Sequence, residues 1–435
     1  MLNILDLRGA TGDLAALLPR PAVAVEQPVD AVRAIIAEVR AGGDAAVRAC
    51  TERFDGASID ELRVPVTELR RALDAVAPEL RRALEVARDN IEAYHLTQVG
   101  PEVVHRRDGI EVRDLHRAVD RAGLYVPGGR AAYPSTVLMT AVPAKVAGVP
   151  ELVLCVPPDR DGRVPDVVLA AACLAGVDEV YRVGGAQAIA AMAYGTESIK
   201  AVDVIVGPGN IYVAVAKREV AGVVGIPSSF AGPSEVVVIA DATTPVDFAA
   251  IDVVVQAEHG PNGLAWLVTW DEAVADAVSR AVTRLVEASP RRGDIESTLA
   301  EGGHAVICDN PEQAIAVANA IAPEHLELLC ADPEALLPLV RHAGAVFCGP
   351  WSPASVGDYL AGPNHVLPTF GSARFSGALR VDDFVKHVHV VTLDEDGLRR
   401  AAPHVAVLAA AEGLVAHGDS VRVRTAALAA LDPQR

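Results

Sequence analysis

The run Gly123-Leu124-Tyr125-Val126-Pro127-Gly128-Gly129 decides the fold, because it sets a short apolar strand directly before a proline and two glycines. Proline cannot continue a strand ladder, and glycine suits the tight turn that follows a strand. Beyond this run, short apolar stretches alternate with helical stretches, which is the rhythm of a parallel, doubly wound α/β sheet. We expect further strands at 151–156, 179–183 and 202–206, and helices at 136–149, 164–175, 186–194 and 210–220.

A second series of the same construction follows, so the chain is predicted to contain two similar α/β sheets. Before the first series, residues 28–95 read as helices and 103–112 reads as a hairpin. After the second series, 349–379 is a long loop rich in Gly, Pro and Ser, of a kind that is usually functional, and 380–435 ends in helices. The second series has expected strands at 235–240, 264–270, 304–308, 326–330 and 345–348, and helices at 246–259, 271–289, 311–321 and 333–342.

Composition narrows the class of protein. The 435 residues carry a net charge of −19, which disfavours a nucleic-acid role because phosphate binding needs clustered Lys and Arg. The six cysteines are scattered without a CxxC pair, which favours buried thiols in a reducing cytosol. The sequence contains no stretch of 18 uncharged apolar residues and no signal-peptide pattern at its start. We therefore expect a cytoplasmic protein with neither membrane nor nucleic-acid partners.

Two short segments place polar, ionisable groups inside apolar stretches, where burial is costly unless the groups are paired or bind something. Gln256 and His259 lie three residues apart on one helix face, which suits two ligands of one metal ion. The alternative is a helix end whose histidine favours the helix dipole. Glu324 and His325 offer a carboxylate beside an imidazole, the commonest proton movers, and the alternative is a polar pair at a helix end.

Two further pairs of an acid and a histidine occur near the C-terminus. Asp358 and His365 lie in a glycine-flanked segment, where backbone can approach a ligand closely. The alternative is an aspartate that satisfies turn amides beside a surface histidine. Glu412 and His417 read locally as part of an ordinary amphipathic helix that ends at a glycine.

Nucleotide binding has only a weak local signal. The G-x-G-x-x-G fingerprint of dinucleotide-binding folds is missing. The Gly-rich loops at 184–185 and 207–209 open helices, where phosphate can bind to the free backbone N–H groups. Tight turns need glycine in any case, so neither loop decides the question alone.

Read together and in order, these segments resemble the histidinol dehydrogenase family from near residue 20 to near the C-terminus. The matching stretches are long and specific, and chance agreement at this density is negligible. They are 123–129, 135–140, 183–190, 207–210, 231–236, 256–259, 323–326, 357–359, 364–369 and 411–417.

The resemblance implies two incomplete Rossmann-like doubly wound domains, a homodimer with intertwined termini, and one zinc ion per site. It also implies the NAD-dependent oxidation of L-histidinol to L-histidine through a held aldehyde, the last steps of histidine biosynthesis. The domain division that follows is an N-terminal arm at 1–20, a first domain at 21–124 and 237–379 with most of the metal and catalytic residues, an inserted NAD-binding domain at 125–236, and a C-terminal helical dimerisation segment at 380–435.

Site residues are carried over by the same resemblance. The implied acid/base residues are Glu324 and His325, and the implied NAD-binding positions are Tyr125, Gln187 and Asn210. The implied zinc ligands are Gln256, His259, Asp358 and His417. Substrate contacts are implied for the zinc ligands and His325 together with Ser234, His365 and Glu412. The family further implies that Glu412 and His417 enter the site from the partner subunit.

The implied chemistry agrees with this inventory. Histidinol offers an imidazole nitrogen and an amine, so zinc is expected to orient the substrate rather than to activate a water. His325 would take the hydroxyl proton, and Glu324 would deprotonate the water that attacks the aldehyde. Two positions depart from the family pattern: Ser228 stands where many relatives carry Asp, and Ala354 where some carry Glu.

Other functions stay open at this point. The first is a related zinc- and NAD-dependent dehydrogenase for another small polar alcohol. The second is a metal-dependent hydrolase in which zinc activates water. The third is a metabolite-binding protein without catalysis. These alternatives differ in whether NADH forms, and from which substrate.

Overall fold

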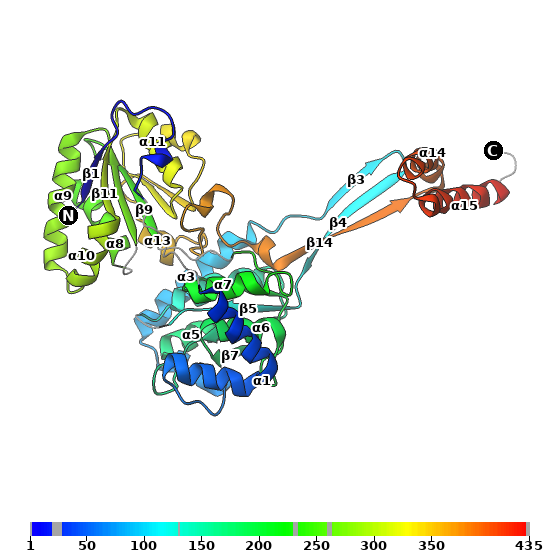
Figure 1. Cartoon of the computed structure of the whole chain (residues 1–435), viewed down its shortest axis with the longest axis horizontal. Helices are drawn as coiled ribbons and strands as arrows, with labels where there is room; N and C mark the ends of the chain where they lie inside the picture. Colours follow the sequence, from blue (N-terminus) through cyan, green and yellow to red (C-terminus); the bar gives the residue numbers. More distant parts are fainter. Residues whose placement is uncertain (1, 20–27, 129–130, 229–233, 259–262, 432–435) are drawn as a thin grey trace. The chain divides into compact units, whose positions relative to one another are not determined.

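The computed structural model describes residues 2–19, 28–128, 131–228, 234–258 and 263–431. The chain divides into two compact units. Unit 1 comprises Met1–Gln98 and Asp120–Phe384, and unit 2 comprises Val99–Val119 and Val385–Arg435. Figure 1 labels many of the helices and strands of both units.

Unit 1 contains a wholly parallel sheet of six strands, in the spatial order β1 (Asn3–Asp6), β11 (Gly303–Ile307), β10 (Leu264–Thr269), β9 (Glu235–Ala240), β12 (His325–Leu328) and β13 (Ala345–Cys348). Its associated helices are α8 (Val246–Ala257), α9 (Glu272–Ala288), α10 (Arg292–Gly302), α11 (Pro311–Ile321), α12 (Pro333–Leu336) and α13 (Ala354–Tyr359). Successive strand residues face opposite sides, so Val236 and Val238 pack with α8, α9 and α10, whereas Val237 and Ile239 pack with α11. Helices thus cover both faces, as a parallel sheet requires.

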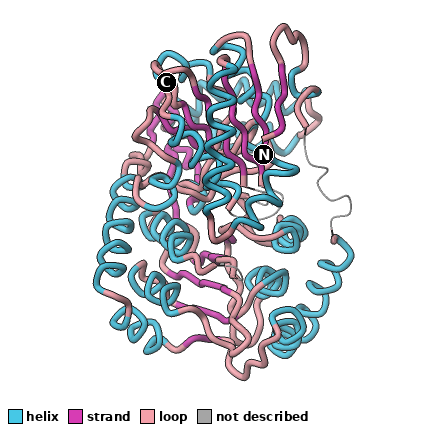
Figure 2. The backbone as a smooth tube through the Cα atoms, turned by 90° about the vertical axis from the view of Figure 1, so that its left-hand side faces the viewer, coloured by secondary structure: helices cyan, strands magenta, loops and turns pink. Residues whose placement is uncertain are grey.

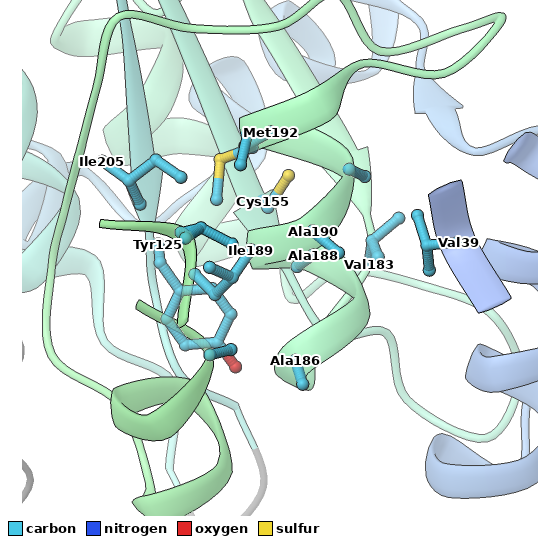
Figure 3. Packing of buried hydrophobic residues seen from close by; sticks show 14 of the residues in the cluster. Val39, Tyr125, Cys155, Val183, Ala186, Ala188, Ile189, Ala190, Met192 and Ile205 are labelled. Carbon is cyan, nitrogen blue, oxygen red and sulfur yellow. The ribbon is translucent and has the colours of Figure 1, made fainter. Parts of the chain in front are cut away.

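A second sheet in unit 1 has five strands, in the order β2 (Arg63–Val64), β7 (Glu179–Arg182), β6 (Glu151–Val156), β5 (Arg121–Tyr125) and β8 (Val204–Val206). All neighbours are parallel except β2 and β7. Its helices are α4 (Pro134–Val146), α5 (Asp166–Leu174), α6 (Gly185–Tyr194) and α7 (Ile211–Val220). Figure 3 shows Tyr125, Cys155 and Ile205 of this sheet packed with Ile189 and Met192 of α6. Figure 2 shows helices (cyan) lying beside the strands (magenta) of the parallel sheets.

Three N-terminal helices complete unit 1: α1 (Val29–Asp55), α2 (Val66–Ala75) and α3 (Pro78–Leu96). The apolar stripe of α1, which includes Val32, Ile36 and Val39, packs into the core around α6 and α7. Helix α2 contacts α5, and α3 contacts α4. These contacts associate 29–96 with the five-stranded sheet, whereas the sequence-based division joins them to 237–379. A helical stripe indicates which face is buried but not which sheet buries it.

Unit 2 consists of an antiparallel sheet in the order β14 (Val385–Leu393), β4 (Ile110–Ala118) and β3 (Val103–Arg107), followed by the helices α14 (Glu395–Ala411) and α15 (Val415–Leu431). The predicted hairpin corresponds to β3 and β4, and the chain ends in helices as expected. The strand β14 was not anticipated. Its residues are mostly exposed, so they lack the strict apolar alternation that identifies a half-buried strand.

The predicted α/β class with two doubly wound parallel sheets is confirmed. The structure differs from the sequence-based expectation at two places in the second series of strands and helices. Helix α10 was missed, and His325 is the first residue of β12 rather than a residue before the strand. Among the described residues, none of the helices combines the length and the apolar character needed to cross a bilayer.

Candidate active site

One cavity in unit 1, of about 330 Å³, takes its lining from both α/β sheets. The five-stranded sheet contributes Pro127 and 207–209, which lie beyond the carboxyl ends of β5 and β8. The six-stranded sheet contributes Ser234, Glu324 and His325, which lie at the amino ends of β9 and β12. Ligand sites of open α/β sheets lie at carboxyl ends, and that rule anticipates only the first of these two walls.

His325 lies near two carboxylates in this cavity. It is registered beside Val236, so it faces the side of the sheet that α8 covers. Its Nδ1 lies 3.4 Å from the Glu235 carbonyl oxygen and 3.8 Å from Glu324 Oε2. Its Nε2 lies 3.4 Å from Asp358 Oδ1. The imidazole is therefore buried between two carboxylates.

Glu324 is buried directly before β12, where its Oε2 accepts a hydrogen bond of 3.1 Å from the Glu235 amide. Burial raises the pKa of Glu324 to about 7. Burial lowers the pKa of His325, but the charges of Glu324 and Asp358 outweigh that effect and raise it to about 9. A buried carboxyl with a pKa near 7, next to an imidazole in the same cavity, is suited to exchange protons with a substrate.

Glu327, two residues after His325 on β12, contacts both α8 and α13. It lies on the same strand face as His325, is 1% exposed, and accepts a hydrogen bond of 2.9 Å from the Ala354 amide at the start of α13. It also shares a hydrogen bond with the carboxyl of Asp252 on α8. Burial and then the negative charge of Asp252 raise the pKa of Glu327, so at neutral pH the two carboxyls hold a proton between them.

Gln256 and Asp358 each follow a residue of this contact by one helical turn. Gln256 comes four residues after Asp252 on α8, and Asp358 comes four residues after Ala354 on α13. Residues four apart share a helix face. A crossover helix runs antiparallel to the strands that it connects, so the end of α8 lies near the amino ends of the strands. Gln256 is in the last turn of α8 and therefore lies toward the edge of the sheet at which His325 begins β12. Gln256 is 4% exposed, and its Nε2 has no hydrogen-bond partner among the described residues.

His365 is held by two hydrogen bonds at the edge of the same cavity. Its Nδ1 lies 2.8 Å from the Asp358 carbonyl oxygen, so Nδ1 carries the proton and donates. Its Nε2 lies 3.3 Å from Thr136 Oγ1 on α4 and accepts from that hydroxyl. The neighbouring Asn364 donates a hydrogen bond of 2.6 Å to the Met139 carbonyl oxygen of the same helix. These contacts fix the loop that carries His365 to α4.

A second cavity of about 870 Å³ lies at the carboxyl ends of the five-stranded sheet. Tyr125, Gln187 and Asn210 all line it. The Tyr125 hydroxyl accepts a hydrogen bond of 3.1 Å from the Gly185 amide, and Asn210 caps α7 by accepting from the Tyr212 amide at 3.0 Å. Gln187 is buried, and neither polar atom of its amide has a partner among the described residues. Of these three residues, Gln187 therefore has an amide that is left without a partner within the described residues.

Asp55 and Lys217 are among the lining residues that the sequence analysis did not single out. Asp55, at the end of α1, lines the larger cavity, and burial raises its pKa to about 6. Lys217 of α7 lines the smaller one, where it is buried and donates a hydrogen bond to the Gly207 carbonyl oxygen. Burial lowers the pKa of Lys217 to about 7. A single charged residue on a helix normally indicates a solvent-facing position, so no local signal distinguished them.

Four predicted site residues do not line either cavity, and they are Gln256, His259, Glu412 and His417. His259 lies outside the described residues. Glu412 follows α14 and His417 lies in α15, so both belong to unit 2, and both are exposed. The entry of Glu412 and His417 into the site from a partner subunit stays a prediction.

Comparison with known proteins gives a consistent picture. The family model described as histidinol dehydrogenase matches residues 18–425. A histidinol dehydrogenase of Parasynechococcus marenigrum is 50% identical over 423 residues, covering 96% of each chain, and one of Moorella thermoacetica is 49% identical over 94% of this chain and 96% of its own. The crystal structure of histidinol dehydrogenase from Elizabethkingia anophelis superposes with a TM-score of 0.94 and 35% identity, covering 98% of each chain. The chain therefore belongs to the histidinol dehydrogenase family of oxidoreductases.

Proposed function

We propose that this chain is a zinc- and NAD-dependent enzyme that oxidises L-histidinol to L-histidine through the aldehyde, as the last steps of histidine biosynthesis in the cytoplasm. We further propose that it works as a homodimer with shared sites. Membership of the family supports the substrate and the reaction class. The single observation that carries the mechanism is the burial of Glu324 and His325 in one cavity beside Asp358.

Zinc would be held by Gln256, His259 and Asp358, with His417 supplied by the partner subunit. The donor set of nitrogen and oxygen atoms is one that zinc accepts. Gln256 is buried and its Nε2 has no hydrogen-bond partner among the described residues, so its amide nitrogen does not fix the orientation of the side chain, which can turn its oxygen to a metal ion. When bound, zinc would supply a positive charge that coordinates the imidazole and amine nitrogens of the substrate.

The chain's own residues would move the protons in both steps. His325 takes the proton of the substrate hydroxyl as hydride leaves the carbon, and NAD, when bound, is the hydride acceptor. In the second step, Glu324 takes a proton from the water that attacks the aldehyde. His325, after releasing its first proton to solvent, takes a hydroxyl proton of the hydrate as a second hydride leaves the carbon for a second NAD. A cysteine nucleophile is not needed, and burial raises the pKa of Cys155 and Cys308, which disfavours their thiolates.

NAD would occupy the larger cavity, where Tyr125, Gln187 and Asn210 are gathered. Its volume of about 870 Å³ suits a large part of a dinucleotide. Asp55 adds a carboxylate whose Oδ2 has no hydrogen-bond partner among the described residues. A carboxylate in this setting accepts hydrogen bonds from ribose hydroxyls and repels a ribose phosphate, so it favours NAD over NADP.

An NAD reduction assay with L-histidinol tests the proposal. We expect two NADH per histidinol consumed, because the aldehyde is held until its second oxidation. One NADH per histidinol would mean that the aldehyde escapes. Formation of NADH only with a different alcohol would favour a related dehydrogenase, and product formation without NAD would favour a hydrolase.

The contact between Glu327 and Asp252 gives a second prediction. Glu327→Gln retains a donor for Asp252 and an acceptor for the Ala354 amide, so zinc content and activity should stay within about twofold of the parent. Glu327→Ala removes both, and we expect zinc affinity to fall about 10- to 100-fold, as for other residues that position metal ligands. Competition with a chelator measures the affinity. Equal zinc affinity in the Gln and Ala variants would contradict the positioning role.

Asp55 gives a prediction for pH. In the folded chain the pKa is raised from 3.8 to about 6, so the charged carboxylate opposes folding above pH 6. Below the unfolded value, the carboxyl is protonated in both states and the penalty is absent. Asp55→Asn should therefore raise the free energy of unfolding by about 1–2 kcal/mol at neutral pH, with the gain shrinking as the pH falls toward 4.

Urea unfolding at several pH values measures this effect, and the KM for NAD measures the loss of a cofactor contact. Asp60→Asn is the matched control, because Asp60 is exposed and should give neither change. A stability gain for Asp55→Asn that does not depend on pH, with an unchanged KM, would remove Asp55 from the cofactor site.

A further inference from the structure

Four ionisable side chains form a square on one face of the small sheet in unit 2. Strands β4 and β14 are antiparallel, with His116 registered opposite His387 and Asp114 opposite His389. Residues opposite one another, and residues two apart on a strand, point to the same face of a sheet. Asp114, His116, His387 and His389 therefore share one face, and we call them the histidine square.

The distances within the histidine square are short. His387 Nδ1 lies 3.0 Å from Asp114 Oδ2, and His116 Nε2 lies 3.8 Å from the same oxygen. His389 Nε2 lies 3.9 Å from Asp114 Oδ1. One ligand atom each from Asp114, His116 and His387 lie within 4.8 Å of one another. The imidazole rings of His116 and His387 are 4.7 Å apart between centroids.

Asp114, which is close to all three histidines, has one carboxylate oxygen without a hydrogen-bond partner among the described residues. This oxygen, Oδ1, is buried. An aspartate is ordinarily ionised at neutral pH, and Asp114 accepts a hydrogen bond of 3.0 Å from His387 at its other oxygen, Oδ2. An ionised carboxylate with a buried, unpaired oxygen, surrounded by imidazoles, presents a ready anionic ligand to a cation.

We propose that the histidine square is a second zinc site, built from Asp114, His116 and His387 with His389 as the fourth ligand. Tetrahedral zinc with bonds of about 2.0–2.1 Å places its ligand atoms about 3.3 Å apart. The distances between the nitrogen and oxygen atoms of the histidine square, 3.0–3.9 Å, lie on both sides of that value. Rotation of the exposed and part-exposed side chains can bring the more distant atoms to the distance that zinc requires. Three imidazoles and a carboxylate are a ligand set suited to zinc and related transition metals.

This site is independent of the proposed function. It shares no residue with Gln256, His259, Asp358 and His417, and it lies wholly within unit 2. Four protein ligands leave no open position, which is the pattern of a structural rather than a catalytic zinc site. Zinc here would tie β14 to β4, two strands from distant parts of the sequence, and stabilise the sheet that precedes α14.

Zinc content per chain tests the proposal on the full-length protein. The chain is stripped with a chelator, reloaded with zinc chloride, desalted and assayed for zinc and for histidinol-dependent NADH formation. We expect His116→Gln, His387→Gln and the double variant each to hold one zinc fewer than the parent, with activity unchanged. His404→Gln is the control, because His404 is an exposed histidine of α14 in the same unit and should lose no zinc.

The count separates the outcomes. If the catalytic zinc of the proposed function is wrong, the parent holds one zinc and the histidine-square variants hold none, which still supports this site. Equal zinc in the parent and in the two single variants, each with a native circular dichroism spectrum, overturns it. Zinc that declines equally in His404→Gln would mean adventitious surface binding only and would also overturn it.

Discussion

A hydrogen bond between two buried carboxyls, Asp252 of α8 and Glu327 of β12, constrains the candidate site more than any other contact. Burying two acids together is unfavourable unless they share a proton and their remaining acceptors are satisfied. Here the Ala354 amide donates a hydrogen bond to Glu327 Oε1 and brings in α13. This contact joins α8, β12 and α13. One helical turn further along, α8 carries Gln256 and α13 carries Asp358 on the side of His325. The same contact thus positions two of the proposed metal ligands.

The site then combines opposite edges of two similar sheets. The five-stranded sheet uses its carboxyl edge, where glycine-rich loops leave room for a cofactor. The six-stranded sheet uses its amino edge, where the register of β9 and β12 sets His325 and Glu324 beside the Glu235 backbone. This division agrees with the proposed chemistry, in which the cofactor binds on one sheet and protons are exchanged on the other.

Much of this could be predicted from the sequence, and the limits have physical causes. The alternation of apolar strands and helices predicted both parallel sheets, and Glu324 and His325 of the motif at 323–326 are buried, as expected from their apolar surroundings in the sequence. Glu327, Asp252, Asp55 and Lys217 were missed, because a lone charge in an apolar segment has no partner in its own neighbourhood. The histidine square was missed because β14 pairs with β4 across most of the chain.

The most direct test of the central claim is anomalous diffraction at the zinc edge from crystals of the zinc-loaded chain. The account predicts a peak about 2.0–2.2 Å from an oxygen of Gln256 and an oxygen of Asp358, next to His325. It would be contradicted by Gln256 turned away from Asp358, with no zinc peak between them.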